Sequence, residues 1–565
     1  MRLLNKDLRL QDVTLMYLTV LATVVVLLVA SYQAPAVHSR PALAYHIPLD
    51  PSGQLELSWN ISYPTQEVYL ELKVKELHHG ILLGMSDRGE PINADLVLLW
   101  DDGHKSYFGV RIQIMTAFSF LGELFKRLHS TCDFFVEGTV HIIYAMLERP
   151  ILSLHELNIS RLQPGVQRVL LLRPDTPSPA LPRDVRTLEV LAPDVIIPTQ
   201  ETTYWCHIYQ LPPNMPKNHI VMYESVITPG NEAIVHHIEV FECSPQMDTV
   251  PQYSGSCDSK MKPRKLNYCR HVLAAWAMGA EPFYYPADAG LPLGGEGSSR
   301  FLRLEVHYHN PLLISGRRDS SGIRLWYTPS LRRFDAGIME LGLVYTPVMA
   351  IPPRQRAFQL TGYCTDKCTQ TALPVGGIHI FASQLHTHLA GLGVRTVLVR
   401  GGREVDVVQE DKHFSTHYQV LNQGDALVTK CTYNTEDRDK VTVGGFGIME
   451  EMCINYVHYY PRTQLELCKS HVDTDYLQKY FSLINRFQGR ESCSCPQTTV
   501  EEQFSSLSWD GFSGEVLNSL YLTSPISMHC NQSTAELFPG EWEKQEIPVV
   551  TAELQRAPYP CELSR

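Results

Sequence analysis

Two histidines stand two positions apart in the run QLHTHL, whose composition is typical of a β-strand. In a strand, residues i and i+2 point to the same face and lie about 7 Å apart. His386 and His388 can therefore bring two imidazoles to one metal ion. The spacing fits equally well two histidines on a solvent-exposed strand face, so both interpretations stay open on spacing alone.

Further histidines occur close together in two other strand-like runs. In VHHIEV, His236 and His237 are adjacent, and in LEVHYHN, His307 and His309 are two apart and share a face. Adjacent strand residues point to opposite faces, so His236 and His237 can bind one metal only at a strand end or at a β-bulge. In a regular strand, one core histidine and one exposed histidine would be the simpler interpretation.

The run EEMCINYVH adds a thioether, Met452, and a phenol, Tyr456. A methionine in an apolar strand usually fills the core, and a buried tyrosine usually has a bonded hydroxyl. Imidazoles and a thioether without a carboxylate cluster disfavour Ca²⁺ and Mg²⁺, which prefer oxygen ligands. Structural zinc usually uses thiolates, which disulfides would consume here. If these side chains bind a metal, the donor set fits copper that cycles through Cu(I).

The N-terminus indicates the compartment in which such chemistry would occur. Residues 13–30 are almost wholly apolar and follow three basic residues, which predicts a cytoplasmic stretch at 1–12 and a signal-anchor transmembrane helix at 13–32. A cleaved signal peptide is the alternative, because small residues follow the apolar run. In both cases the remainder of the chain enters the lumen of the secretory pathway.

Cysteines and glycosylation sequons agree with a lumenal location. All fourteen cysteines lie after the apolar segment, and their even number suits an oxidising compartment. Three sequons place candidate glycosylation sites at Asn60, Asn158 and Asn531.

Length and composition indicate a globular protein of several domains. The chain has 565 residues, of which 44% are hydrophobic and 19% charged. It is too long for one core and too apolar for a disordered chain. The net charge is -12 without a long basic run, so nucleic acid is not an expected partner.

Alternation of apolar and polar residues predicts a mostly β protein. Runs such as LELSWNISY alternate with period two within residues 44–147, a proline-rich connector follows at 173–184, and the chain up to about 496 is again strand-rich. Its frequent Gly and Pro turns are typical of paired antiparallel sandwiches. The best helix candidate lies at 476–486, and the final segment resembles a small tail unit held by disulfides.

Ten longer motifs carry a specific family resemblance. TTYWC, NEAIVHHIEVFEC, CDSKMKP, NYCRHVLAAWAMGA, LRLEVHYHNP, GIMELGLVYTPVMAIPP, GYCTDKC, IHIFASQLHTHLAG, CTYNTEDR and GGFGIMEEMCINYVHYYP resemble the motifs of the copper type II, ascorbate-dependent monooxygenases. The resemblance runs from about residue 187 to the C-terminus and, more loosely, through the N-terminal region. It implies a DOMON-like β-sandwich at 41–172, antiparallel β-sandwich copper domains at 187–334 and 335–496, and a disulfide-linked dimerisation tail at 497–565.

The resemblance implies two copper ions per chain with different roles. His236, His237 and His307 match the three-histidine copper that transfers electrons. His386, His388 and Met452 match the copper that binds oxygen and substrate, and His386 is expected to be catalytic. His309 lies outside the family's ligand set and is expected to be structural. In the family the two sites lie far apart across a solvent-filled cleft.

The reaction and its partners are implied in the same way. Ascorbate supplies two electrons, one at a time, and O₂ hydroxylates the benzylic carbon of a phenethylamine, converting dopamine to noradrenaline. Tyr204 matches a catalytic position, and Tyr456 matches a second active-site tyrosine. Because the amine is cationic, a carboxylate is expected near the second copper, with Glu305, Glu340 and Glu450 as candidates.

Disulfide pairings and assembly also follow from the resemblance. The implied pairs are Cys206–Cys257, Cys243–Cys269, Cys364–Cys468, Cys431–Cys453, Cys368–Cys530 and Cys132–Cys561. Cys493 and Cys495 match cysteines that bridge subunits, which implies a disulfide-linked homo-oligomer, either a dimer or a tetramer. The implied location is the lumen and membrane of a secretory vesicle, with a secreted form if the anchor is cleaved.

The sequence departs from the family pattern in two places. Residues 110–127 replace a longer acidic stretch of the N-terminal sandwich, which is therefore shortened, and a basic strand after His417 is shortened inside the second copper domain. Two alternative functions stay open: a copper monooxygenase of the same family with an unidentified substrate, and a non-enzymatic copper-binding or adhesion protein. The polar run APYPCELSR disfavours the first, whose C-terminal tail is hydrophobic, and the intact ligand set disfavours the second.

Overall fold

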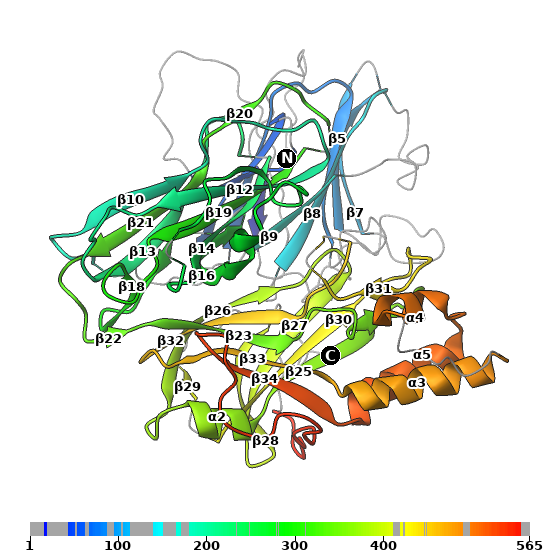
Figure 1. Cartoon of the computed structure of the whole chain (residues 1–565). Helices are drawn as coiled ribbons and strands as arrows, with labels where there is room; N and C mark the ends of the chain where they lie inside the picture. The colour runs from blue at the N-terminus through cyan, green and yellow to red at the C-terminus, as the bar shows by residue number, and fades with distance from the viewer. Residues whose placement is uncertain are drawn as a thin grey trace.

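Antiparallel β-sheets dominate the computed structural model of the chain, so the predicted mostly β fold is confirmed (Figure 1). The structure describes residues 16–19, 43–50, 53–62, 67–86, 95–102, 105–112, 139–150, 165–170, 180–232, 234–247, 249–277, 280, 282–310, 312–410, 419–421, 424–445, 447, 449–489 and 498–554. We refer to strands β1 to β9 as the N-terminal sandwich, to β10 to β22 as the first sandwich and to the elements from β23 onward as the second sandwich.

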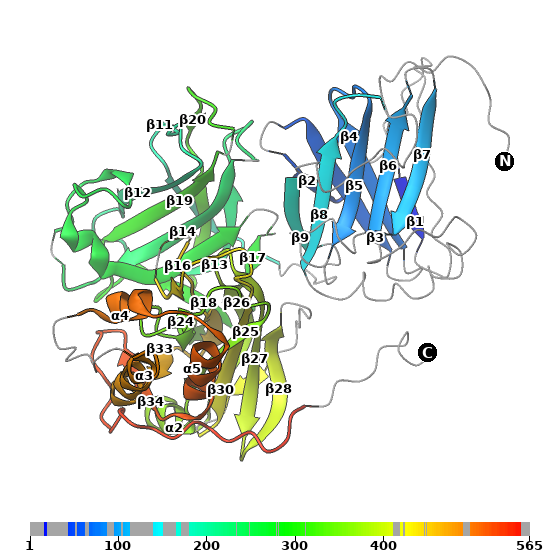
Figure 2. The ribbon, with the colours of Figure 1, turned by 90° about the vertical axis from the view of Figure 1, so that its right-hand side faces the viewer.

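The N-terminal sandwich consists of two antiparallel sheets packed face to face (Figure 2). One has the order β1-β4-β3-β2 and the other β7-β6-β5-β8-β9. Their bounds are β1 Met16–Thr19, β2 Tyr45–Pro48, β3 Leu55–Ser62, β4 Glu67–Val74, β5 Gly80–Ser86, β6 Asp95–Asp101, β7 Ser106–Ile112, β8 Thr139–Met146 and β9 Gly165–Leu170. Leu55, Leu57 and Trp59 alternate into the core with Ile142, as the period-two pattern predicted. The DOMON likeness of residues 41–172 stays a prediction.

The expected transmembrane helix at 13–32 overlaps the described residues only at Met16–Thr19. These four residues form β1, which pairs antiparallel with β4, and are not described as part of a helix. Apolar and β-branched residues suit an added strand as well as a helix, and β4 offers a sheet edge at this position. Within the described part of the chain, no helix is long and apolar enough to cross a membrane. The other residues of 13–32 lie outside that part, and the membrane anchor stays a prediction.

The first sandwich packs the sheet β10-β21-β13-β18-β22, with β17 paired to β13, on the sheet β15-β12-β19-β14-β16. Its elements are β10 Arg186–Leu191, β11 Val195–Ile196, β12 Thr202–Gln210, β13 Asn218–Val226, β14 Val235–Cys243, β15 Ser254–Ser256, the 3₁₀ turn η5 Arg264–Tyr268, β16 Cys269–Ala277, β17 Phe283–Tyr284, β18 Ala289–Leu293, β19 Phe301–His309, β20 Arg318–Asp319, β21 Gly322–Thr328 and β22 Phe334–Asp335. Ile238 and Val240 of β14 and Leu304 and Val306 of β19 are fully buried in its core. The residues between them therefore point out of the opposite face of this sheet.

The second sandwich has a six-stranded sheet, β29-β26-β32-β23-β33-β34, and a four-stranded sheet, β25-β30-β27-β28. Its strands are β23 Gly337–Leu343, β24 Ala350–Ile351, β25 Phe358–Cys364, β26 Ile378–His386, β27 Gly391–Arg400, β28 Arg403–Glu410, β29 Gln419–Leu421, β30 Ala426–Tyr433, β31 Thr442–Val443, β32 Ile454–Tyr460, β33 Leu465–Val472 and β34 Ile526–Gln532. Its helices are α2 Asp366–Ala372, α3 Thr474–Phe487, α4 Val500–Ser506 and α5 Gly511–Thr523. The helix predicted at 476–486 is confirmed as α3, which begins after Asp473, whose carboxylate accepts a hydrogen bond from the backbone N–H of Asp475.

The C-terminal segment is part of the second sandwich in the described residues. β34 pairs antiparallel with β33 at the edge of the six-stranded sheet, and Trp542 is buried in the core between the two sheets. Figure 1 shows α3, α4 and α5 gathered at one end of this sandwich. The tail therefore completes the sheet that carries the β26 histidines.

Five disulfides join cysteines in the pairs that the family resemblance implied. They are Cys206–Cys257, Cys243–Cys269, Cys364–Cys468, Cys368–Cys530 and Cys431–Cys453. Cys132, Cys561, Cys493 and Cys495 lie outside the described residues, so the sixth pair and the bridge between subunits stay predictions.

Candidate metal centres

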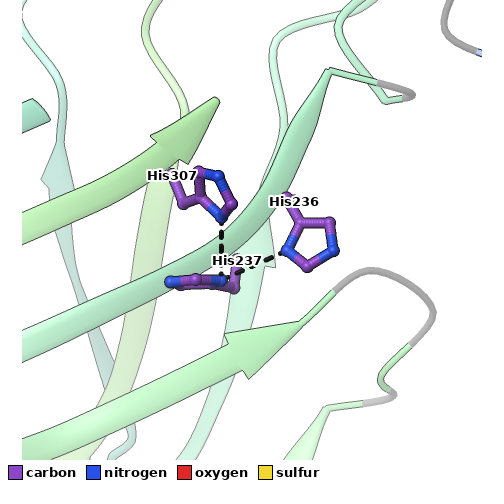
Figure 3. A group of neighbouring side chains, drawn as sticks. All are labelled: His236, His237 and His307. Carbon is purple, nitrogen blue, oxygen red and sulfur yellow. Dashed lines mark hydrogen bonds between the residues drawn. The ribbon is translucent and has the colours of Figure 1, made fainter. Parts of the chain in front are cut away.

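His236, His237 and His307 form one cluster on the outward face of the first sandwich (Figure 3). His237 lies directly opposite His307 in the pairing of β14 with β19. The register shifts by one residue between Val235 and His237, so His236 sits at a β-bulge. This is the irregularity that two adjacent histidines need in order to reach one metal.

The geometry of this cluster fits a metal ion. The Nδ1 atoms of His236 and His307 each lie 3.2 Å from Nδ1 of His237. Ligand nitrogens at about 2.0–2.1 Å from a metal, spread at tetrahedral angles, would be about 3.3 Å apart. Burial and the neighbouring His236 lower the pKa of His307 to about 3, and burial lowers the pKa of His237 well below its usual value. The cluster therefore presents neutral imidazole nitrogens, which suit copper.

Tyr204 belongs to the same cluster. It lies opposite His307 in the pairing of β12 with β19, and its ring stacks on the His307 imidazole with centroids 4.4 Å apart and planes 10° apart. Burial and then Glu305 raise the pKa of the Tyr204 hydroxyl, so the phenol stays protonated. The structure thus places Tyr204 beside the three histidines, and its catalytic role stays a prediction.

His309 stays outside the converging group. Its ring centroid is 6.3 Å from that of His236, and it is absent from the set of nitrogens that lie within reach of one ion among the described residues. This placement agrees with the structural role expected for it.

His386 and His388 lie next to the chain segment that carries Met452. β26 and β32 are antiparallel, with Gln384 opposite Tyr456 and His386 opposite Ile454, where their ladder ends. Beyond the ladder, the backbone N–H of His388 donates to Glu451, the residue before Met452, at 2.9 Å. The imidazole rings of His386 and His388 have centroids 5.2 Å apart, and Met452 is buried, with 6% of its surface exposed.

Hydrogen bonds orient the ligand atoms of this second cluster. His388 Nδ1 lies 3.0 Å from the carbonyl oxygen of Glu450. A carbonyl can only accept, so Nδ1 carries the proton and Nε2 keeps the lone pair for a metal. The Tyr433 hydroxyl donates to the carbonyl oxygen of Met452 at 2.6 Å, and the disulfide Cys431–Cys453 pins the next residue. Burial and His388 lower the pKa of His386 to about 3, which leaves its imidazole neutral.

The two sandwiches contact each other beside the clusters, whereas the family resemblance implied two sites far apart across a solvent-filled cleft. His386 and His388 are near enough to His237 to contribute to the lowering of its pKa, after burial and the two histidines of its own cluster. Gln384 Nε2 donates across the interface to the carbonyl oxygen of Ala275 at 3.3 Å and to the Tyr223 hydroxyl at 3.4 Å.

Aromatic and charged contacts explain this closure. Phe283 of the first sandwich contacts His458 of the second, with ring centroids 4.6 Å apart, and Phe381 packs on Tyr285. The His271 Nδ1 atom also contacts the Glu466 carboxylate across the interface. Apolar area buried between the sandwiches favours this closed arrangement over an open cleft.

Each of the three carboxylates expected near the second cluster already has a hydrogen-bond or ion-pair partner within the chain. Glu340 accepts from Lys469 Nζ at 2.8 Å, Glu305 lies 3.4 Å from Arg303, and Glu450 accepts from the backbone N–H of Gly447 at 2.7 Å. Glu340 is nevertheless a neighbour of Tyr456, which lies opposite it in the pairing of β23 with β32. Burial, then Glu340, raises the pKa of Tyr456, whose ring centroid is 6.4 Å from that of His386.

Glu239 is a fourth carboxylate that the sequence reasoning missed. It lies opposite Glu305 in the pairing of β14 with β19 and shares the outward face with His237, two residues before it. Burial and Glu305 raise its pKa to about 8. Its spacing of two from His237 was the signal that could have identified it.

The sequons fall on different parts of the structure. Asn60 lies on β3, where its Oδ1 atom accepts from the backbone N–H of Ala44 at 2.6 Å, and Asn531 lies on β34. Asn158 is outside the described residues. Glycosylation of all three stays a prediction.

Comparisons with known proteins match these two sandwiches to one family. The N-terminal domain model of the copper type II ascorbate-dependent monooxygenases matches residues 188–315, and the C-terminal domain model matches residues 334–481. Bovine dopamine beta-hydroxylase is 58% identical over 97% of this chain and 95% of its own length. Tyramine beta-hydroxylase of Caenorhabditis briggsae is 42% identical over 64% of this chain and 62% of its own length. Human DBH-like monooxygenase protein 1 is 33% identical over 78% of this chain and 75% of its own length.

Copper affinity of the three-histidine cluster should change little between about pH 7 and about pH 5. A histidine with the ordinary pKa of about 6.5 would be mostly protonated at the lower pH, and copper would have to displace that proton. Burial lowers the pKa of His307 to about 3 and lowers that of His237 well below its usual value, so protons do not compete for these two ligands. Competition of the full chain with a chromogenic Cu(I) chelator measures the affinity at each pH.

The matched variants for this measurement are His307→Phe and His309→Phe. We expect the first to lose the three-histidine copper and the second to retain it, because only His307 belongs to the converging group. A loss of affinity of about tenfold or more per pH unit in the unsubstituted chain would contradict ligands that are held neutral.

Proposed function

The chain belongs to the copper type II, ascorbate-dependent monooxygenases, and from this we propose that it hydroxylates the benzylic carbon of dopamine to give noradrenaline. The observation that carries the proposal is the convergence of His236, His237 and His307. A second pair of imidazoles, His386 and His388, supports it, and we infer that Met452 completes their donor set. Each set would hold one copper ion, so we infer two per chain.

When bound, copper supplies the one-electron redox chemistry and the activation of O₂, with ascorbate as the electron donor. The reaction joins one oxygen atom of O₂ to the substrate and releases the other as water, which takes two electrons and two protons. The chain would hold the five imidazoles and the thioether in place. Tyr433 and the Cys431–Cys453 disulfide support the strand that carries Met452.

Dopamine is preferred over an unidentified substrate on the strength of the likeness. Bovine dopamine beta-hydroxylase shares 58% of residues across nearly the whole of both chains, whereas human DBH-like monooxygenase protein 1 shares 33% over about three quarters. A non-enzymatic copper-binding protein would have no need of two complete and different donor sets. The shortening after His417 falls partly outside the described residues and removes none of the six donors.

Glu239 is the carboxylate that we infer holds the protonated amine. Ala275, whose carbonyl oxygen accepts from Gln384, lies directly opposite Glu239 in the pairing of β14 with β16. Gln384 is two residues from His386 on one face of β26, so Glu239 adjoins the second cluster. Glu305, Glu340 and Glu450 have partners within the chain, which leaves Glu239 to pair with a cation. An arriving ammonium group would favour its charged form.

We propose the cellular location and the oligomeric assembly of the protein from its sequence alone. Residues 13–32 would anchor the chain in the membrane of a secretory vesicle, with residues 41–565 in its lumen, and Cys493 and Cys495 would link subunits.

The central test is conversion of dopamine by the copper-loaded full chain, dependent on O₂ and ascorbate. Met452→Ile should lower turnover by more than about 100-fold, because it removes the thioether while keeping an apolar side chain of similar size. Copper analysis should show retention of the three-histidine copper. Met528→Ile, a substitution of a buried methionine on β34, is the control that should keep normal turnover. Normal turnover in Met452→Ile would remove Met452 from the mechanism.

Glu239→Gln should raise KM for dopamine by about 10- to 100-fold with a smaller effect on kcat, since it removes a charge-assisted contact with the ammonium group. Steady-state oxygen consumption gives both parameters. Glu189→Gln, on the exposed edge strand β10 where Glu189 pairs with Arg324, is the control. A neutral phenethyl substrate without the amine should be unaffected by Glu239→Gln, and an equal loss for both substrates would argue against an amine contact.

A further inference from the structure

A fully buried carboxylate lies between the chain segment of His388 and the chain segment of Met452. Glu451, the residue before Met452, has no exposed surface. Its Oε2 atom accepts from the backbone N–H of His388 at 2.9 Å, and its Oε1 atom accepts from the backbone N–H of Ala390 at 2.6 Å. One side chain thus connects the segment of Met452 with the segment of His388.

These bonds replace strand pairing where it stops. The described ladder between β26 and β32 ends at His386, opposite Ile454. Beyond that point the chain turns at residues 389–390, so the N–H groups of His388 and Ala390 have left the ladder. A buried N–H without a partner is costly, and Glu451 satisfies both. Glu451 therefore links the segment of His388 to the segment of Met452 beyond the end of the β26–β32 ladder.

Glu451 is itself fixed from the other side. Its backbone N–H donates to the carbonyl oxygen of Val443 at 3.0 Å. Arg438 approaches Oε1 to 4.0 Å and donates to Thr442 Oγ1 at 2.8 Å and to the Met449 carbonyl at 3.0 Å. These contacts hold the Glu451 carboxylate in one position.

We propose that Glu451 is a positioning residue for the second copper: its carboxylate sets His388 against Met452 so that imidazole and thioether reach the same ion. This inference rests on the proposed function only in requiring that His388 and Met452 share a copper ion. Glu451 touches neither the ion nor the substrate, and it acts through the backbone of His388 and through its own peptide link to Met452.

The Glu451 carboxylate is hard to replace because both of its oxygens accept hydrogen bonds from backbone N–H groups. Glutamine has the same shape but only one acceptor, and its NH₂ group would face the N–H of His388 or Ala390, donor against donor. Aspartate keeps both acceptors but is shorter by one methylene group. We expect Glu451→Gln to displace His388 from Met452, and Glu451→Asp to give an intermediate effect.

The test uses X-ray absorption of the ascorbate-reduced, copper-loaded full chain, in which sulfur scattering reports the Met452 ligand directly. Glu451→Gln should lose most of this sulfur signal and bind the second copper about 10- to 100-fold more weakly in chelator competition, while the three-histidine copper is unchanged. A role in folding alone would lower the melting temperature without removing the sulfur signal.

Glu404→Gln is the matched control. Glu404 is also a buried carboxylate of the second sandwich that accepts a backbone N–H, from Leu554 at 3.0 Å, and pairs with Arg395 at 2.9 Å. It lies on β28 in the other sheet of this sandwich, so its variant should keep both copper ions and the sulfur signal.

The outcomes separate this inference from the proposed function. Glu451→Gln that folds and keeps full sulfur scattering would overturn the positioning role. If that variant does not fold, Glu451→Asp with an unchanged sulfur signal and unchanged affinity would overturn it equally. An unsubstituted chain that shows no sulfur scattering would instead overturn the sharing of one copper by His388 and Met452, and with it the proposed function.

Discussion

In the pairing of β14 with β19, the register shifts by one residue between Val235 and His237. That shift gives two adjacent histidines a common direction, which regular strand geometry does not allow. Ile238 and Val240 remain in the core, and Glu239 between them lies on the opposite face of the sheet. In the second cluster, the pairing of β26 with β32 places His386 opposite Ile454, and the Glu451 carboxylate connects the segments of His388 and Met452 beyond the end of the ladder. Hydrogen bonds thus hold both clusters before a metal arrives.

Burial between the two sandwiches favours the neutral forms of both the histidines and the carboxyl groups there. It lowers the pKa of His386 to about 3 and raises the pKa of Glu239 to about 8, because removal of water disfavours every charged form. The imidazoles become neutral donors for the same reason that the carboxyl group loses its charge. A copper ion or a cationic substrate would then be the main charge in the space, and the side chains would respond to it.

The sequence supported much of this arrangement, and local geometry accounts for the parts it missed. The period-two pattern predicted strands, including the buried Leu55, Leu57 and Trp59, and the spacing of His386 and His388 predicted a shared face. Spacing alone argued against His236 with His237, because a bulge depends on how β14 pairs with a strand about seventy residues later. Met452 joined the second cluster only through the family resemblance, since its partner strand is far away in the chain. The spacing of Glu239 from His237 could have placed it on the same face, whereas the closure of the sandwiches depends on contacts between domains, which no local pattern encodes.

The edge position of β34 affects the order in which the two sandwiches can fold during synthesis. The sheet that carries the second cluster is complete only when residues 526–532 pair with β33 and Trp542 enters the core. Until that late part of the chain has been synthesised, β33 presents an open edge, which invites pairing with other chains. The first sandwich ends at Asp335 and has no such dependence in its described strands. We therefore expect the first sandwich to fold while the chain is still emerging, and the second sandwich to wait for residues 526–542.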